Sequence, residues 1–276
     1  MRAVIAYPGV EGSFSYGAAR SAFPDAQWKG YDTFEDAARS VLEGEARYAV
    51  LPIENSSAGA VLTTYSILEK EPLWIVGECT QPVRHQLLGI PGSQLAGIRT
   101  ITSHPQAISQ CAAFLSSLQG VQIVPSGNTA LSAREVANRG DPAWAAIASE
   151  EAARIFGLSV IAEDIHTSKH NTTRFMILSR YPIPLETPNK ASVIFTVDNT
   201  VGALVRVLDS FARSGLNMTR IESRPIPDTP FLYFFSGDFE GAMDKDHLEE
   251  AMDNARPFTT QLRLLGIYAK ARMTDE

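Results

Sequence analysis

The 276-residue chain has little of what marks disulfide-rich, metal-binding or membrane proteins. Its two cysteines, Cys79 and Cys111, are too few for a disulfide framework and lack metal-ligand spacing. The sequence contains no run of about 18 apolar residues, which is the length that a helix needs to span a bilayer. The N-terminus also lacks the apolar segment of a secretory signal. Nineteen glycines and sixteen prolines are too few for a collagenous or low-complexity chain. We therefore expect a globular, cytoplasmic protein that does not bind membranes.

Positive charge is also scarce, since 24 basic residues face 31 acidic ones and the net charge is −7. This balance disfavours a nucleic-acid partner, because its phosphates would be repelled at long range. An anionic ligand would have to be captured by local donors. Apolar residues (45%) and charged residues (20%) occur at ordinary frequencies for a globular chain.

Strand-like and helix-like segments alternate through the first 180 residues, which favours mostly parallel sheets covered by helices in two α/β lobes. Thr33 is expected to cap one helix, and Gly157 to end another. The expected strands are 4–7, 48–53, 73–77, 99–102, 121–124, 144–148 and 175–178. The expected helices are 34–42, 60–70, 106–118, 131–138 and 150–156.

A second domain is expected beyond residues 181–190, where three prolines in ten residues indicate an extended linker. The order of elements then becomes βαββαβ, which is the ferredoxin-like arrangement. The expected elements are a strand at 192–197, a helix at 202–214, strands at 217–223 and 231–239, a helix at 247–255 and a strand at 262–268.

Two polar clusters follow strands of the first region, where open α/β sheets present ligand sites. The first cluster, Gly12 to Ser15, lacks the spacing of a dinucleotide loop and instead favours an anion held at the start of a helix. The second runs from Pro52 to Gly59 and brings Glu54, Asn55 and Ser56 into one turn. Ordinary turn and cap chemistry explains this second cluster equally well.

Two further clusters occur later in this region. Ser103 is expected to cap a helix that carries Gln110, while Cys111 is expected in the core because nothing nearby would lower its pKa. The last cluster extends from His166 to Phe175, and its two histidines lie four residues apart. Its threonines, serine and asparagine disfavour the helix that a zinc site would need.

With these clusters in this order, the chain resembles the monofunctional prephenate dehydratases, which carry a C-terminal ACT regulatory domain. The matching segments are Gly12–Ser15, Pro52–Ser56 with Gly59, Ser103–Ala107 with Gln110–Cys111, Thr129–Ala130, Ala146–Ser149, Phe156–Leu158 and Asn171–Phe175, then Gly202–Leu204, Asn217–Thr219 and Ile221–Pro225. The loop Tyr7–Gly12 is nearer to that of arogenate dehydratases, which leaves arogenate as an alternative substrate.

The resemblance implies a catalytic domain at 1–182, a linker at 183–189 and an ACT domain at 190–276. The catalytic domain would have two lobes like those of periplasmic binding proteins, about 1–79 with 165–182 and about 80–164, with a cleft between them. It implies the dehydration and decarboxylation of prephenate to phenylpyruvate in L-phenylalanine biosynthesis, without metal or cofactor. A non-catalytic binding or sensor protein for small anions is the alternative of another class.

The resemblance also assigns roles to residues. Thr173 donates a hydrogen bond to the leaving hydroxyl, and Glu54 is the candidate proton source. Arg174 binds a substrate anion, unless strand alternation turns it into a structural ion pair. The remaining catalytic residues are Asn55, Ser103 and Gln110, and the remaining substrate-binding residues are Ser13, Phe14, Ser56 and Phe175.

In the ACT domain, the resemblance implies an L-phenylalanine site at the interface of a homodimer, with a tetramer as the further possibility. Helix-start N–H groups would receive the effector carboxylate. A purely structural dimerisation domain is the competing interpretation. The expected effector residues are Gly202, Ala203, Leu204, Asn217, Met218, Glu222, Ser223, Arg224 and Pro225.

Overall fold

The computed structural model describes residues 2–168, 170–226, 229, 233–241, 243 and 245–271. The chain divides into two compact units, Met1–Gly59 with Thr80–Phe175 and Ala60–Cys79 with Met176–Glu276. Two of the three boundaries along the chain therefore fall inside long strands, β5 (Trp74–Pro82) and β11 (Thr172–Ser179). The expected domain limits, with a linker at 183–189, stay a prediction.

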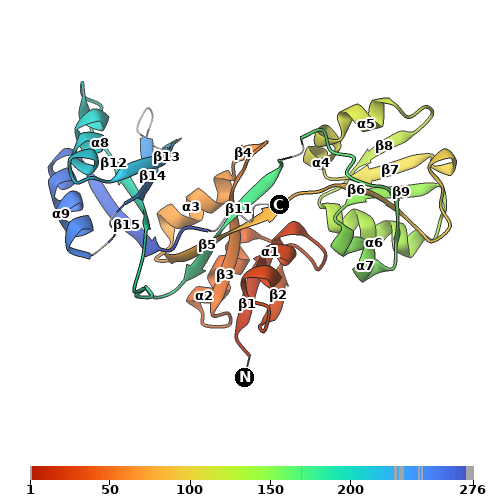
Figure 1. The fold of residues 1–276 in the computed structure, drawn as a ribbon, viewed down its shortest axis with the longest axis horizontal. Helices are drawn as coiled ribbons and strands as arrows, with labels where there is room; N and C mark the ends of the chain where they lie inside the picture. The colour runs from red at the N-terminus through yellow and green to blue at the C-terminus, as the bar shows by residue number, and fades with distance from the viewer. Residues whose placement is uncertain are drawn as a thin grey trace. The chain divides into compact units, whose positions relative to one another are not determined.

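The first sheet has the strand order β2-β1-β3-β11-β5, with β4 paired to β3 (Figure 1). Strand β1 pairs in parallel with both β2 and β3. The strands not yet given are β1 (Val4–Pro8), β2 (Gln27–Tyr31), β3 (Tyr48–Asn55) and β4 (Gly59–Ala60). The helices of this part of the sequence are α1 (Phe14–Ala22), α2 (Phe34–Leu42) and α3 (Leu62–Lys70). Thr33 caps α2 as expected, because its hydroxyl accepts from the Asp36 N–H.

The second sheet has the order β10-β6-β9-β7-β8 and is mixed rather than mostly parallel. Strand β7 is parallel to β8 and β9, whereas β6 is antiparallel to β9 and β10. The strands are β6 (Gln86–Gly89), β7 (Thr100–Ser103), β8 (Gln122–Pro125), β9 (Trp144–Ala148) and β10 (Ser159–Ala162). Apolar residues of α4 (Pro105–Gln110) and α5 (Ala112–Ser116) pack on one face. Those of α6 (Thr129–Arg139) and α7 (Glu150–Phe156) pack on the other (Figure 1).

The single helix expected over 106–118 is divided at Cys111, whose φ of −104° and ψ of 12° are not helical. Its side chain is fully buried in the core beneath the two short helices. The cap of α4 also differs from the prediction. His104 caps it by accepting from the Gln106 N–H at 3.2 Å, because Ser103 is the last residue of β7 and is buried.

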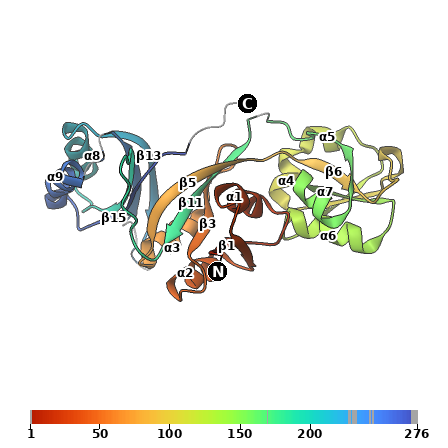
Figure 2. The same ribbon diagram turned by 60° about the horizontal axis from the view of Figure 1, so that its bottom comes forward.

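In the second unit, residues 190–268 form the expected βαββαβ order, with an antiparallel sheet ordered β13-β14-β12-β15. Its helices α8 (Ala203–Arg213) and α9 (Lys245–Ala255) lie side by side on one face of the sheet (Figure 2). Phe211 of α8 stacks on Phe239 with ring centroids 4.2 Å apart. The strands are β12 (Lys190–Thr196), β13 (Asn217–Pro225), β14 (Tyr233–Glu240) and β15 (Gln261–Tyr268). Residues 231 and 232 of the expected strand lie outside the described residues.

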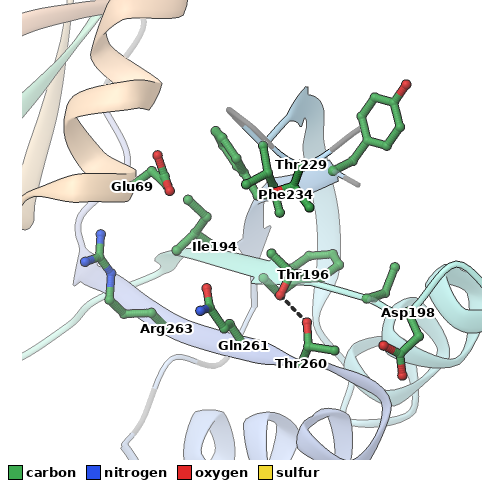
Figure 3. Close-up of a pocket in the computed structure, with 13 residues that line it drawn as sticks. Glu69, Ile194, Thr196, Asp198, Thr229, Phe234, Thr260, Gln261 and Arg263 are labelled. Atoms are coloured by element: carbon green, nitrogen blue, oxygen red, sulfur yellow. Dashed lines mark hydrogen bonds between the residues drawn. The ribbon is translucent and has the colours of Figure 1, made fainter. Parts of the chain in front are cut away.

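The same unit contains a cavity of about 420 Å³ beside β12 and β15 (Figure 3). Glu69 of α3 and Arg263 of β15 line it, and the hydroxyls of Thr196 and Thr260 are hydrogen-bonded to each other at its wall. In the described part of the chain, none of the predicted effector residues lines this cavity. No helix among the described residues is long and apolar enough to cross a membrane.

Candidate active site

The end of β3 and the start of β11 bring Asn55 and Thr173 together in the first unit. The Asn55 amide nitrogen donates to the Thr173 hydroxyl oxygen at 2.9 Å and to the Asn171 side-chain oxygen at 2.8 Å. The Asn55 side-chain oxygen accepts the backbone N–H groups of Ser57 and Ala58 at 3.0 and 2.9 Å. All four hydrogen-bonding positions of the Asn55 amide are therefore used.

The network continues from β11 to the C-terminal end of α4. The Asn171 amide nitrogen donates to Gln110 Oε1 at 3.0 Å, and His85 Nε2 lies 2.8 Å from the same oxygen. Burial lowers the pKa of His85, and the nearby His166 lowers it further, while the bond to Gln110 has the opposite effect. We call Asn55, Asn171, Thr173, Gln110 and His85 the neutral network, since none of its side chains carries a charge when the His85 imidazole holds a single proton.

Glu54 and Arg174 are separated from Thr173 by strand alternation. Successive residues of a strand point to opposite faces, so Glu54 faces away from Asn55 and Arg174 faces away from Thr173. The two side chains form an ion pair instead, with Arg174 Nη2 3.1 Å from Glu54 Oε2. This placement gives no support to the prediction that Glu54 supplies a proton at Thr173, and that role stays a prediction. For Arg174 it corresponds to the structural alternative rather than to a contact with substrate.

Three more predicted site residues form hydrogen bonds within the fold or pack in its core. The fully buried Ser103 donates its hydroxyl proton to the Ile147 carbonyl at 2.6 Å, which joins β7 to β9. Ser56 Oγ donates to the His170 carbonyl and accepts from the Thr172 N–H, each at 3.0 Å. Phe175 is 1% exposed and lies in the core. The predicted substrate contacts of Ser103, Ser56 and Phe175 are not supported by this placement.

Ser13 and Phe14 line a cavity of about 610 Å³ in the first unit, together with Arg84, Gln86 and Arg154. Ser13 caps α1 by accepting from the Tyr16 N–H at 3.2 Å. The Phe14 ring meets the His85 ring edge-on, with centroids 5.5 Å apart. Phe14 therefore joins this cavity to the neutral network, which supports its predicted place and that of Ser13 in a substrate site.

The metal and thiol alternatives find no support among the described residues. No group of three or more histidine, cysteine, aspartate or glutamate side chains there could hold a metal ion. Burial raises the pKa of both cysteine thiols, Cys79 and Cys111, to about 12, with the Glu78 charge adding to the effect at Cys79. Neither thiol has the lowered pKa of a nucleophilic cysteine.

Sequence reasoning missed His85, which lies just before β6 and outside every motif. The one available signal was a histidine two residues before the apolar run Leu87–Leu88, where a buried polar side chain needs a hydrogen-bond partner.

The predicted effector residues occupy the start of α8 and the length of β13. Gly202 precedes α8 with a φ of 76°, a conformation that favours glycine. Asn217, Ser223 and Pro225 are exposed on β13, which is an edge strand of its sheet. Leu204 and Met218 pack partly against the core, so only a portion of each is open to a ligand. Ala203 is buried, and Glu222 and Arg224 are half-buried. Their predicted roles stay predictions.

Comparisons with known proteins agree with this geometry. The family model of prephenate dehydratase matches residues 5–182. The arogenate dehydratase/prephenate dehydratase 1 of Arabidopsis thaliana is 37% identical over 280 residues, which cover 96% of this chain and 71% of that protein. A bifunctional N-acyl-homoserine lactone acylase/prephenate dehydratase of Komagataeibacter europaeus is also 37% identical, over 96% of this chain and 95% of its own length.

A crystal structure shows the same relationship. The prephenate dehydratase of Arthrobacter aurescens, solved in complex with L-Phe, superposes with a TM-score of 0.88 and 33% identity over 96% of this chain and 89% of that one. These matches place the chain among the dehydratases of phenylalanine biosynthesis. It belongs to the prephenate dehydratase family.

Proposed function

We propose that the chain converts prephenate to phenylpyruvate, and that residues 1–182 form the catalytic domain with two lobes like those of periplasmic binding proteins. The observation that carries the proposal is the orientation of the Thr173 hydroxyl. Because its oxygen accepts from Asn55, its own proton can point outward to a ligand. The family match identifies this ligand as prephenate, whose C4 hydroxyl leaves as water.

The charges of the reaction suit a site built from neutral donors. The prephenate dianion and one proton give the phenylpyruvate anion, carbon dioxide and water. As the bond to the ring carboxylate breaks, its electron pair enters the ring and the C4–oxygen bond breaks, so negative charge develops on the leaving oxygen. Donors such as Thr173 and Gln110 stabilise that charge. A strong cation beside the ring carboxylate would stabilise the ground state and oppose decarboxylation.

The test is a spectrophotometric assay with purified protein and prephenate, run in parallel with Thr173→Val. The proposal expects phenylpyruvate from the unaltered protein and a large loss of kcat in the variant. If neither prephenate nor arogenate is turned over, the chain is not a dehydratase, and the alternative of a small-anion binding protein gains.

Arogenate is the second candidate substrate, and two observations favour it. The relatives include proteins named arogenate dehydratase, such as the 36% identical arogenate dehydratase 2 of Petunia hybrida. The loop Tyr7–Gly12 also resembles theirs. Arogenate carries an ammonium group where prephenate has a keto oxygen, so parallel measurements of kcat/KM with the two substrates decide between them.

We further propose that residues 190–276 form an ACT domain that binds L-phenylalanine and pairs with a second copy in a homodimer or tetramer. The L-Phe complex of the Arthrobacter aurescens relative supports the choice of effector, and Gly202 at the start of α8 supports the place. Calorimetry and kinetics with L-phenylalanine test the proposal. Absence of both binding and inhibition at millimolar concentration would leave a structural dimerisation domain. Cytoplasmic localisation stays a prediction.

A further inference from the structure

His85 lies within the neutral network, but the reaction proposed above gives it no role of its own. Its side chain is buried, with the residue 2% exposed. Its backbone is held on both sides, since its N–H donates to His166 Nδ1 at 3.3 Å and its carbonyl accepts the Ile165 N–H at 2.9 Å. The Phe14 ring packs edge-on against the imidazole. The imidazole is therefore fixed in place beside Gln110.

The orientation of the network can be worked out from its backbone end. The N–H groups of Ser57 and Ala58 can only donate, so the Asn55 atom that they contact must be the amide oxygen. The other Asn55 atom is then the NH₂ group, and it donates to both Asn171 and Thr173. The Asn171 atom that receives this bond must be its oxygen.

The same reasoning passes from Asn171 to His85. Since the Asn171 oxygen faces Asn55, its NH₂ group faces Gln110 and donates to Oε1 there. Gln110 Oε1 is an acceptor, so His85 Nε2, which lies 2.8 Å away, must be the donor and carry the proton. Two backbone amides thus determine the tautomer of a histidine through three side-chain amides.

We propose that His85, protonated at Nε2 only, is a positioning residue that holds the Gln110 amide with its oxygen inward and its NH₂ group toward the substrate. The inference rests on the proposed function, since it concerns the same reaction. In the described part of the chain, Gln110 Oε1 receives both His85 and Asn171, while its amide nitrogen contacts no acceptor. A flip of this amide would place an NH₂ group against two donors and turn an acceptor toward the developing negative charge.

The surroundings of the second ring nitrogen favour the neutral form. Among the described residues, the buried His85 Nδ1 has no hydrogen-bond partner. A proton there would add a buried donor without an acceptor and a buried charge without a counter-ion, and both are unfavourable. The His166 ring, whose centroid lies 6.2 Å away, cannot compensate a positive charge either. Burial also lowers the pKa of His85, which favours the same neutral form.

The tautomer can be tested without any substrate. In ¹⁵N NMR spectra of the full-length protein, protonated and unprotonated imidazole nitrogens have distinct chemical shifts. The His85→Phe variant assigns the signals by their loss. We expect at neutral pH one protonated nitrogen, Nε2, and one unprotonated nitrogen, Nδ1. A proton on Nδ1, or on both nitrogens, would overturn the inference whatever the protein catalyses.

The positioning role is tested by kinetics in two backgrounds. Phenylalanine at 85 keeps the ring packing and removes the donor, so His85→Phe should lower kcat/KM about tenfold, the effect of about one hydrogen bond. If His85 acts through Gln110, the same substitution made on Gln110→Ala should cost less than about twofold. A general loss of structure would instead reduce activity equally in both backgrounds, and that outcome rejects the inference.

A matched control and the wild type separate the remaining outcomes. His247 is exposed on α9, so His247→Phe should leave kcat and KM unchanged. Melting curves of all variants show whether each is folded. An inactive wild type with the expected tautomer would refute the proposed function alone. An active wild type in which His85→Phe keeps full kcat/KM would refute the positioning role alone.

Discussion

Asn55 donates a 2.9 Å hydrogen bond to the hydroxyl oxygen of Thr173, and this bond determines where the Thr173 proton can point. A hydroxyl has one proton to donate. In the described part of the chain, Asn55 is the only side chain that forms a hydrogen bond with the Thr173 hydroxyl, and it does so as the donor. The proton is therefore available to a ligand on the side away from Asn55. The proposed catalytic use of Thr173 therefore depends on an amide from another strand.

Replacing Thr173 with valine keeps the shape of the side chain and removes the donor. We expect kcat to fall by roughly 100-fold, the usual scale for one donor to a developing oxyanion, while Thr173→Ser keeps much of the activity. Thr172→Val is the matched control, because strand alternation turns Thr172 to the opposite face of β11. A Thr173→Val variant with near wild-type kcat would remove Thr173 from the mechanism.

Asn55→Asp tests the direction of the network. A carboxylate still accepts the two N–H groups of Ser57 and Ala58, but it cannot donate to Thr173 or Asn171. The Thr173 proton would then turn toward the carboxylate instead of the substrate, so we expect kcat to fall by about 100-fold and the melting temperature to drop. Ser57→Ala keeps the backbone contact and should change kcat less than about twofold. Full activity in Asn55→Asp would contradict the assigned orientation.

Glu54 and Arg174 are expected to affect stability rather than catalysis. Arg174→Ala should leave KM for prephenate unchanged, and Glu54→Gln should leave kcat unchanged. The Glu54 side chain is 42% exposed and the Arg174 side chain 16%, so solvent screening keeps their coupling near 0.5 kcal/mol, in the roughly 0.2–1 kcal/mol range of exposed pairs. A double-mutant cycle in urea measures this coupling. A large rise in KM for Arg174→Ala would restore its predicted contact with substrate.

Much of the fold could be predicted because the signals are local. Helix α7 (Glu150–Phe156) has the predicted limits, and Gly157 follows it with a φ of 66°. The βαββαβ order of residues 190–268 was also correct, because each element there has its own hydrophobic pattern. The strands that were missed, β2, β4, β6 and β10, have two to five residues each and lack a clear alternation.

The site was predicted in part for a similar reason. Motifs led to Asn55, Thr173 and Gln110, which the fold brings into one network. Strand alternation alone could have separated Glu54 from Thr173, since Glu54 adjoins Asn55. The partner of Ser103 could not be found this way, because its hydroxyl bonds to a carbonyl 44 residues later that only the pairing of β7 with β9 brings close.

A buried ion pair in the second unit makes a prediction about stability. Lys190 Nζ lies 3.0 Å from both carboxylate oxygens of Glu78, and their side chains are 5% and 2% exposed. Lys190→Met leaves a buried carboxylate without this cation, so we expect a loss of about 3–5 kcal/mol in the free energy of unfolding. The double variant with Glu78→Leu should recover part of it. If the free energy of unfolding of Lys190→Met lies within about 1 kcal/mol of the wild-type value, well short of the roughly 3–5 kcal/mol typical of such losses, the ion pair is not important for stability.

His85 should also make the stability of the protein depend on pH in one direction. Its pKa in the folded protein lies below the ordinary value of 6.5. Between those two values the unfolded chain binds more protons than the folded one, so the free energy of unfolding falls as the pH drops through this window. The contribution is complete above about pH 6.5 and is lost progressively below it. His85→Phe lacks this group, so the difference in stability between wild type and variant isolates the contribution of His85 from that of the other titrating residues. Urea unfolding of both proteins between about pH 5 and 8 should show the wild type losing stability relative to the variant as the pH falls. A difference that is constant, or that changes in the opposite direction, would show that His85 is not held neutral in the folded protein.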